Sequence, residues 1–118
     1  MAQYVTLEEL KRALHLEGLE LHDDELLGII DDAEGVVIAA TDYPEEDFRR
    51  IPKESLPGPL HRAMLRLAIY DWNDKGETQS DLYIQLALAP VRPYQRMAGG
   101  SRLQAIIDRY APGEGSVD

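Results

Sequence analysis

The chain has 118 residues, with 22 Asp and Glu against 12 Lys and Arg, so its formal net charge is −10, and it contains no cysteine. A chain of this length has room for one compact core and hence one domain. The lack of cysteine excludes a disulfide framework, a thiolate zinc site and a cysteine nucleophile, and it fits synthesis in a reducing cytoplasm. No apolar run is long enough to span a membrane, and the negative charge argues against wrapping duplex nucleic acid.

The charges are segregated along the sequence. Residues 13–48 contain twelve acidic and no Lys or Arg side chains, for a net charge of −12, whereas residues 49–66 contain five basic side chains against Glu54 alone, for +4. Blocks of opposite sign favour pairing within the chain, or between identical subunits arranged head to tail. A solvated acidic face that keeps the protein soluble is the alternative interpretation.

The first two expected helices are clearly marked. A capping box at Thr6 and Glu9, followed by leucines at helical spacing, predicts a short helix over about residues 7–14. A second helix is expected over about residues 23–41, because acidic side chains suit its positive N-terminal end and an apolar stripe runs along its length.

The other side of the second helix carries two glycines, Gly28 and Gly35, with Asp31 between them. Each interior glycine costs roughly 1 kcal/mol relative to alanine. A neighbouring subunit or helix that packs closely against this face would explain them. Tertiary packing that simply tolerates the glycines is the other explanation.

Prolines dominate residues 42–59, which predicts a long loop without regular structure. Residues 60–73 then resume a helical pattern that is apolar around most of its circumference, so this helix is expected to be central or to lie in an oligomer interface. Its narrow polar strip carries Arg62 and Arg66, which are four residues apart and therefore adjacent on the helix surface.

The C-terminal part is expected to contain two more helices. A polar turn over residues 74–80 leads to a short helix that Pro90 ends, and Gly99 and Gly100 are interpreted as a hinge. Ser101 can cap a last helix, before a disordered tail over residues 112–118. The apolar face of this last helix consists of Leu103, Ile106, Ile107 and Tyr110. A helix this short is unstable alone, so it must dock either on its own domain or on a partner.

We find no catalytic or metal-binding pattern in the sequence. The three histidines lack the spacing of a zinc site, and the adjacent carboxylate pairs point about 100° apart on a helix, which favours a solvated face. No nucleophile elbow, phosphate-binding loop or dinucleotide fingerprint is present. We therefore expect no catalytic residues, no metal and no cofactor.

Four segments together resemble a known family. They are YVTLEELKRALHLEG, DDELLGIIDDAEGVVIAATDYP, PLHRAMLRLAIYDWND and LALAPVRPYQRM, in this order and at these separations over residues 4–97. The sequence resembles the phage head-tail connector (adaptor) proteins. The fold that we expect is all-α, a small bundle of about four helices with a long proline-rich loop and a hinged C-terminal helix. Residues 1–98 would form the connector domain, with its loop at 42–59, and residues 99–118 the hinge, short helix and tail.

The resemblance implies a structural protein and not an enzyme. Such subunits assemble as a ring on the portal of a tailed phage or prophage particle, bind the next neck or tail-completion protein, and continue the channel through which DNA passes. The expected location is the virion neck, after synthesis in the host cytoplasm, and the expected partners include no membrane. A small monomeric helical interaction or regulatory module is the alternative function.

Within such a ring, two sets of residues are candidates for contacts. We expect Arg62 and Arg66 to pair with Asp31 and Asp32 of the same or the adjacent subunit, on the face that carries the two glycines, Gly28 and Gly35. Exposed pairs of this kind are worth only about 0 to 1 kcal/mol each, so they would set register more than strength. The apolar residues of the last helix are expected to form an arm that docks on the portal.

Overall fold

A computed structural model describes residues 3–73, 81–96 and 101–110, and these residues form an all-α fold, as the sequence predicts. They contain six α-helices and two short 3-10 helices. In chain order these are α1 (Leu7–Ala13), α2 (Asp23–Ala40), α3 (Glu45–Phe48), η1 (Lys53–Ser55), α4 (Gly58–Asn73), α5 (Asp81–Leu88), η2 (Ala89–Tyr94) and α6 (Ser101–Arg109). No helix in these ranges is both long and apolar enough to cross a membrane.

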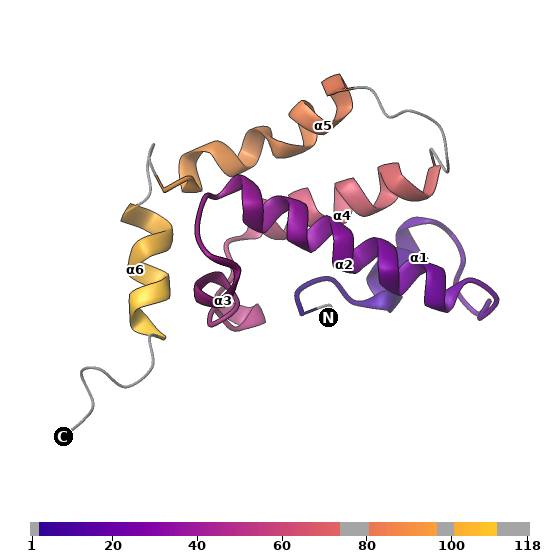
Figure 1. Ribbon diagram of the computed structural model, residues 1–118. Coiled ribbons are helices and arrows are strands. Elements are labelled where there is room, and N and C mark those ends of the chain that lie inside the picture. Colours follow the sequence, from indigo (N-terminus) through magenta and orange to yellow (C-terminus); the bar gives the residue numbers. More distant parts are fainter. Residues whose placement is uncertain (1–2, 74–80, 97–100, 111–118) are drawn as a thin grey trace.

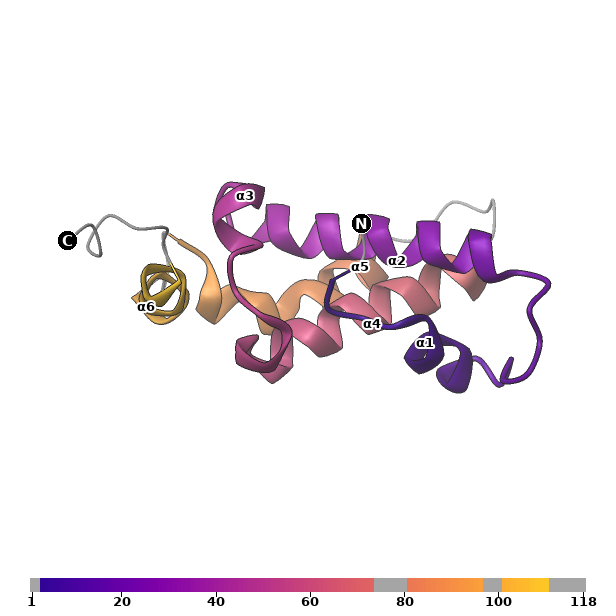
Figure 2. The same ribbon diagram turned by 90° about the horizontal axis from the view of Figure 1, so that it is seen from below.

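Helices α2 and α4 form the centre of the fold. They pack against each other and run in opposite directions, as both views show (Figures 1 and 2). α1 contacts both of them near one end of the protein, and α5 and η2 contact α4 on another side. α6 packs against η2 at the opposite end from the α1–α2 loop (Figure 1). The expected central position of the residue 60–73 helix is therefore confirmed.

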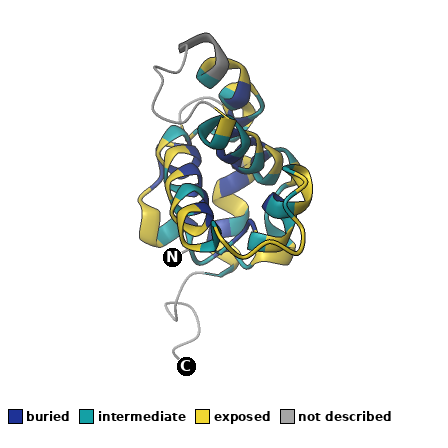
Figure 3. Cartoon of the chain, turned by 90° about the vertical axis from the view of Figure 1, so that its right-hand side faces the viewer, coloured by how far each residue is buried: buried dark blue, intermediate teal, exposed yellow. Residues whose placement is uncertain are grey.

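One apolar core joins all these elements. Its side chains lie on the inner faces of the helices, whereas the outer faces are mostly exposed (Figure 3). α2 contributes the stripe that the sequence predicts, and α4 contributes a set spaced three and four residues apart. The fully enclosed large side chains include Tyr4, Leu10, Leu26, Ile30, Ile38, Phe48, Ile51, Leu60, Met64 and Leu103. Because Leu103 belongs to α6, the last helix shares the core of the preceding residues.

The prediction of a loop without regular structure over residues 42–59 is wrong. Helices α3 and η1 lie inside this range, and α4 begins at Gly58. Each proline stands where a helix begins: Pro44 and Pro52 occupy the N-cap positions of α3 and η1, and Pro57 directly precedes α4. A helix start needs no N–H from its first residues, so these prolines begin helices instead of breaking them.

The other helix predictions agree with the structure to within two residues at either end. Pro90 does end the regular α-helix α5, but the chain continues as the 3-10 helix η2. The expected turn at residues 74–80, the hinge at Gly99 and Gly100 and the disordered tail at residues 112–118 lie outside the described residues.

Candidate subunit interface

Helix α4 presents two arginines to solvent. Its buried residues lie on one side, and Arg62 and Arg66 are exposed on the other. Within the described part of the chain, no salt bridge involves either guanidinium group. The pair therefore forms a short cationic stripe, one helical turn long, which we call the arginine stripe.

The outer side of α2 is acidic and built from small residues. Asp24 and Asp32 are exposed there, and Asp31 is half-buried. A Cβ atom added at Gly28 or Gly35 would meet nothing within 4 Å in the described structure. No described helix of the same chain packs against these glycines, so the close approach that they allow is open to a second molecule. We call this side of α2, with its glycines and aspartates, the acidic face.

The arginine stripe and the acidic face lie on two different helices. Arg62 and Arg66 are on the exposed side of α4, and the acidic face is on the side of α2 away from its buried stripe, while Figure 2 shows the two helices side by side. Arg62 and Arg66 form no salt bridge with Asp31 or Asp32 of their own chain in the described residues. The structure therefore does not contain the intrachain version of the expected pairing there, and the version between subunits stays a prediction.

Pairing within the chain is instead concentrated in its first half. All five Lys and Arg residues before residue 60 lie within 4.0 Å of a carboxylate oxygen. The described arginines after that point form no salt bridge in the described residues; they are Arg62, Arg66, Arg92, Arg96, Arg102 and Arg109. Two of them lie over tyrosine rings, Arg96 over Tyr43 and Arg102 over Tyr94. This half of the molecule thus carries guanidinium groups available to an external anion.

The strongest polar contacts surround Glu34, a residue of α2 that is fully buried. Its carboxylate accepts hydrogen bonds from the backbone N–H groups of Gln3, Tyr4 and Val5 at 2.8 to 3.1 Å. Arg49 donates a further bond of 2.7 Å to the same carboxylate. A buried charge needs this degree of compensation, and here the compensation fixes the N-terminal segment to α2 and α3.

Two side chains of this segment extend the same network. The Tyr4 hydroxyl donates to the carbonyl oxygens of Phe48 and Ile51 at 3.1 and 2.7 Å, and the Gln3 amide donates to those of Arg49 and Ile51. Burial raises the pKa of Tyr4 to about 12, although the nearby Arg49 charge opposes this shift. These three carbonyls lie at the last residue of α3 or just after it, so Gln3 and Tyr4 satisfy backbone groups near the end of the short helix.

Sequence reasoning missed this network. Glu34 was counted in the acidic block, whose alternative interpretation was a solvated face. Its position was a signal, because Glu34 lies four residues after Ile30 and three before Val37, within the apolar stripe of α2. A carboxylate at an inward position requires a buried partner.

The described part of α6 packs on its own domain. Leu103 is 0% and Ile107 is 3% exposed, and Ile106 is partly buried against the same core. Tyr110, which follows the helix, forms a 2.7 Å hydrogen bond between its hydroxyl and that of Ser55 in η1. Of the two docking alternatives for this apolar face, the structure has the intramolecular one, so these side chains are not free to bind a portal while α6 is docked.

A shallow groove of about 430 Å³ lies between α1, η1 and the start of α4. In it, Glu9 is 3.0 Å from the His61 imidazole and 3.9 Å from the Lys53 amine. Burial acts to raise the pKa of Glu9, but hydrogen bonds and the neighbouring positive groups outweigh it and hold this pKa below its usual value. No cluster of three or more His, Cys, Asp or Glu that could hold a metal ion occurs in the described ranges.

A scan against protein-family models and searches of curated proteins and of solved structures found no match to this chain. The resemblance to the connector family therefore rests on the four sequence segments alone.

Proposed function

We propose that the protein is a structural head-tail connector subunit of a tailed phage or prophage particle. Copies of the chain assemble as a ring on the portal and continue the DNA channel towards the next neck or tail protein. The four sequence segments that resemble this family support the proposal. The observation that carries it is the pair of surfaces formed by the arginine stripe and the acidic face, which are complementary in charge and lie on the exposed sides of two different helices.

This arrangement favours a ring. Because Arg62 and Arg66 form no salt bridge with the aspartates of the acidic face in their own chain in the described residues, the arginine stripe of one copy is open to the acidic face of another. Such a contact uses a different surface on each partner and repeats around the assembly, which closes if the rotation between neighbours allows it. Gly28 and Gly35 let the backbone of a neighbouring helix come close to α2, since no side chain of the same chain occupies that space in the described residues.

The small energies of exposed ion pairs favour assembly of the ring on the portal as a template. Exposed ion pairs contribute about 0 to 1 kcal/mol each, so the two arginines alone do not hold a ring together in dilute solution. A portal that binds several copies raises their effective concentration, and weak lateral contacts then suffice. We expect the isolated chain to associate weakly and the ring to form on the portal.

The experiment measures mass by light scattering, alone and with the portal protein encoded beside this chain. Wild type should co-assemble with the portal in a ring-sized complex. Arg66→Glu should weaken this assembly at low salt, and the compensating change Asp32→Lys in the same chain should restore part of it. Arg12→Glu is the matched control, because Arg12 is also exposed but already pairs with Glu17 at 3.9 Å in its own chain.

Two results would contradict the proposal. A strict monomer that ignores the portal would favour the small interaction module. Assembly that Arg66→Glu leaves unchanged at low salt would exclude the contact between the arginine stripe and the acidic face.

The proposal also gives α6 a role in portal docking. Because α6 is docked on its own domain, it must first leave that position. Leu103 and Ile107 must leave the core of their own domain before they can bind a portal. Truncation after Gly99 should abolish portal binding while circular dichroism still reports a folded helical domain. Unchanged binding would mean that another surface contacts the portal.

A further inference from the structure

We propose that residues 3–13, the N-terminal segment and helix α1, form an arm that is exchanged between two copies of this chain. In the exchanged form, the arm of one copy binds the Glu34 site of the other. We call these residues the N-terminal arm. The inference concerns how copies associate, and it holds whether or not the assembly is a phage connector.

The arm is bound mainly by residues far away in the sequence. Its polar contacts include bonds to Glu34 and to backbone carbonyls of residues 48–51, and its buried side chains Tyr4, Val5 and Leu10 join the common core. None of these contacts depends on the connection between the arm and the rest of its own chain. A second copy therefore offers the same site, and the arm regains the same hydrogen bonds and buried area in it.

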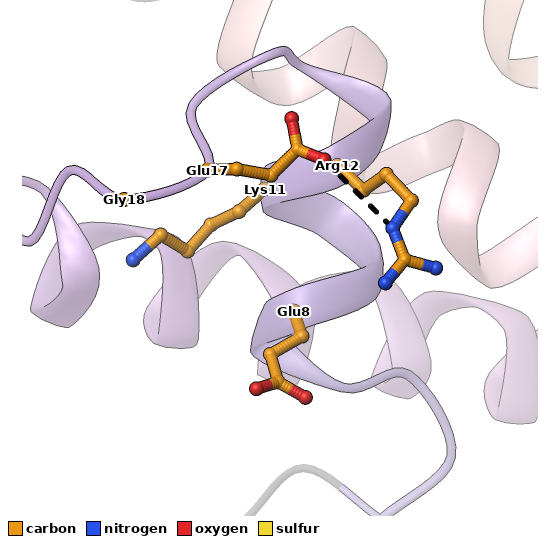
Figure 4. A pocket seen from close by; sticks show the side chains of 5 residues that line it. All are labelled: Glu8, Lys11, Arg12, Glu17 and Gly18. Atoms are coloured by element: carbon orange, nitrogen blue, oxygen red, sulfur yellow. Dashed lines mark ion pairs between the residues drawn. The ribbon is translucent and has the colours of Figure 1, made fainter.

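The connecting loop, residues 14–22, contributes less to the core than the arm does. Leu14 and Leu16 are partly buried against the core, but Leu19 is 54% and Leu21 is 86% exposed, so these last two side chains contribute little to the closed form. The loop also leaves a cavity of about 280 Å³ against α1. Figure 4 shows the side chains around this cavity, where the 3.9 Å contact between Arg12 and Glu17 is the marked ion pair. Both partners are mostly exposed, so the pair adds little stability.

The closed loop also requires an uncommon backbone conformation. His15 has a φ of 60° and Gly18 a φ of 83°. Only glycine adopts this left-handed region without strain, so the conformation of His15 disfavours the closed loop. Opening gives up backbone hydrogen bonds of the loop, which include those from the Leu16 N–H to the Lys11 carbonyl and from the Leu19 N–H to the Leu16 carbonyl. Water can replace these bonds in the opened loop. A short connection under strain between well-docked segments is the condition in which exchange between copies occurs.

The loop is long enough to reach a neighbour. Nine residues in extended conformation span at most about 30 Å. The narrowest dimension of the protein is 19 Å. An opened loop can thus carry the arm to the corresponding site of an adjacent copy.

The test uses full-length chains with single cysteines, which are the sole thiols because the natural sequence has none. Glu9→Cys places the thiol on the arm, and His61→Cys places it on α4, where the native side chains are 3.0 Å apart. The two variants are mixed, unfolded and refolded together at high concentration, and treated with a short bismaleimide. Exchange predicts covalent pairs that contain one chain of each kind, detected by mass spectrometry.

The matched control replaces the arm cysteine by Lys53→Cys, which lines the same groove but does not belong to the arm. Exchange predicts few covalent pairs between Lys53→Cys and His61→Cys chains. If the grooves of two copies were merely close together, both kinds of pair would form equally, and this result would overturn the proposal. The absence of mixed pairs with Glu9→Cys would overturn it as well. Adding His15→Gly to both chains removes the strain of the closed loop and should lower the mixed yield about fivefold, the factor that corresponds to ~1 kcal/mol.

Discussion

The two ends of the described chain dock on the same core by different means. The N-terminal segment is held by a buried carboxylate, three backbone N–H groups, an arginine and a tyrosine hydroxyl. α6 is held by two buried apolar side chains and one hydrogen bond between hydroxyls. Hydrogen bonds to a buried charge are directional, so they fix the register of the N-terminal segment on its site. Apolar contacts determine which face of α6 is buried but restrict the exact position of the helix less strictly.

This difference suggests different behaviour at the two ends. The N-terminal segment should be bound tightly in one way wherever its site is found, in its own chain or in another. α6 should leave its position at lower free energy, because a helix of nine residues keeps little structure without its contacts. The following predictions test this contrast, in order of decreasing expected effect.

The largest effect is expected from Glu34→Gln. The substitution keeps the shape of the side chain but removes the charge that compensates Arg49 in the interior. Loss of one partner from a buried ion pair lowers the free energy of unfolding by about 3–5 kcal/mol. Urea unfolding measures this change.

Glu45→Gln is the matched control for that variant, since Glu45 pairs with the same guanidinium at 3.1 Å but is 63% exposed. Its expected cost is below about 1 kcal/mol. Equal losses in the two variants would mean that burial at Glu34 is not what makes the network strong.

Leu103→Ala should have the next largest effect, but a local one. A buried leucine truncated to alanine costs about 2–3 kcal/mol where the site relaxes in part. Because the contact holds only α6, we expect faster amide hydrogen exchange in α6 and little change in α2. Leu86→Ala, at a position that is 55% exposed, serves as the control and should leave both rates unchanged. A uniform increase in exchange would show that α6 opens only together with the whole domain.

High pH should weaken the N-terminal contacts through Tyr4. The folded pKa of Tyr4 is raised to about 12 from an ordinary value near 10, so the unfolded chain loses its proton first. The contribution of protonated Tyr4 to the free energy of unfolding is fully present below pH 10. It is lost as pH rises from 10 to 12, by on the order of 1.4 kcal/mol per pH unit. Unfolding measured across this range should become easier, and Tyr4→Phe should remove most of the slope. Burial also raises the pKa of Tyr43, so a smaller slope should remain in that variant.

The sequence predicted the helices well because their signals are local. The capping box of Thr6 and Glu9 is present as expected, and the apolar stripe of α2 is buried as expected. The glycine and arginine positions were also identified as outward-facing features from spacing alone. Local signals suffice where a helix needs only one apolar side and a cap.

The Glu34 network could not be predicted in the same way. Its partners lie between 15 and 31 positions away in the sequence, and no rule of spacing connects an N-terminal peptide to a carboxylate in α2. The helices at 42–59 were missed for a different reason, since prolines at helix starts were interpreted as breakers. Docking of α6 on its own domain was one of two alternatives, because amphipathicity specifies an apolar face but not the surface that covers it.

The smallest effect is expected from Tyr110→Phe, which removes the hydroxyl that bonds Ser55 at 2.7 Å and keeps the aromatic ring. A single neutral hydrogen bond in a partly exposed position contributes about 1 kcal/mol. Hydrogen exchange in α6 should therefore rise a few-fold, much less than in Leu103→Ala, and Ser55→Ala should produce the same change without adding to it in the double variant. Full additivity of the two substitutions would mean that each hydroxyl acts through other contacts, and that apolar packing alone holds α6 in place.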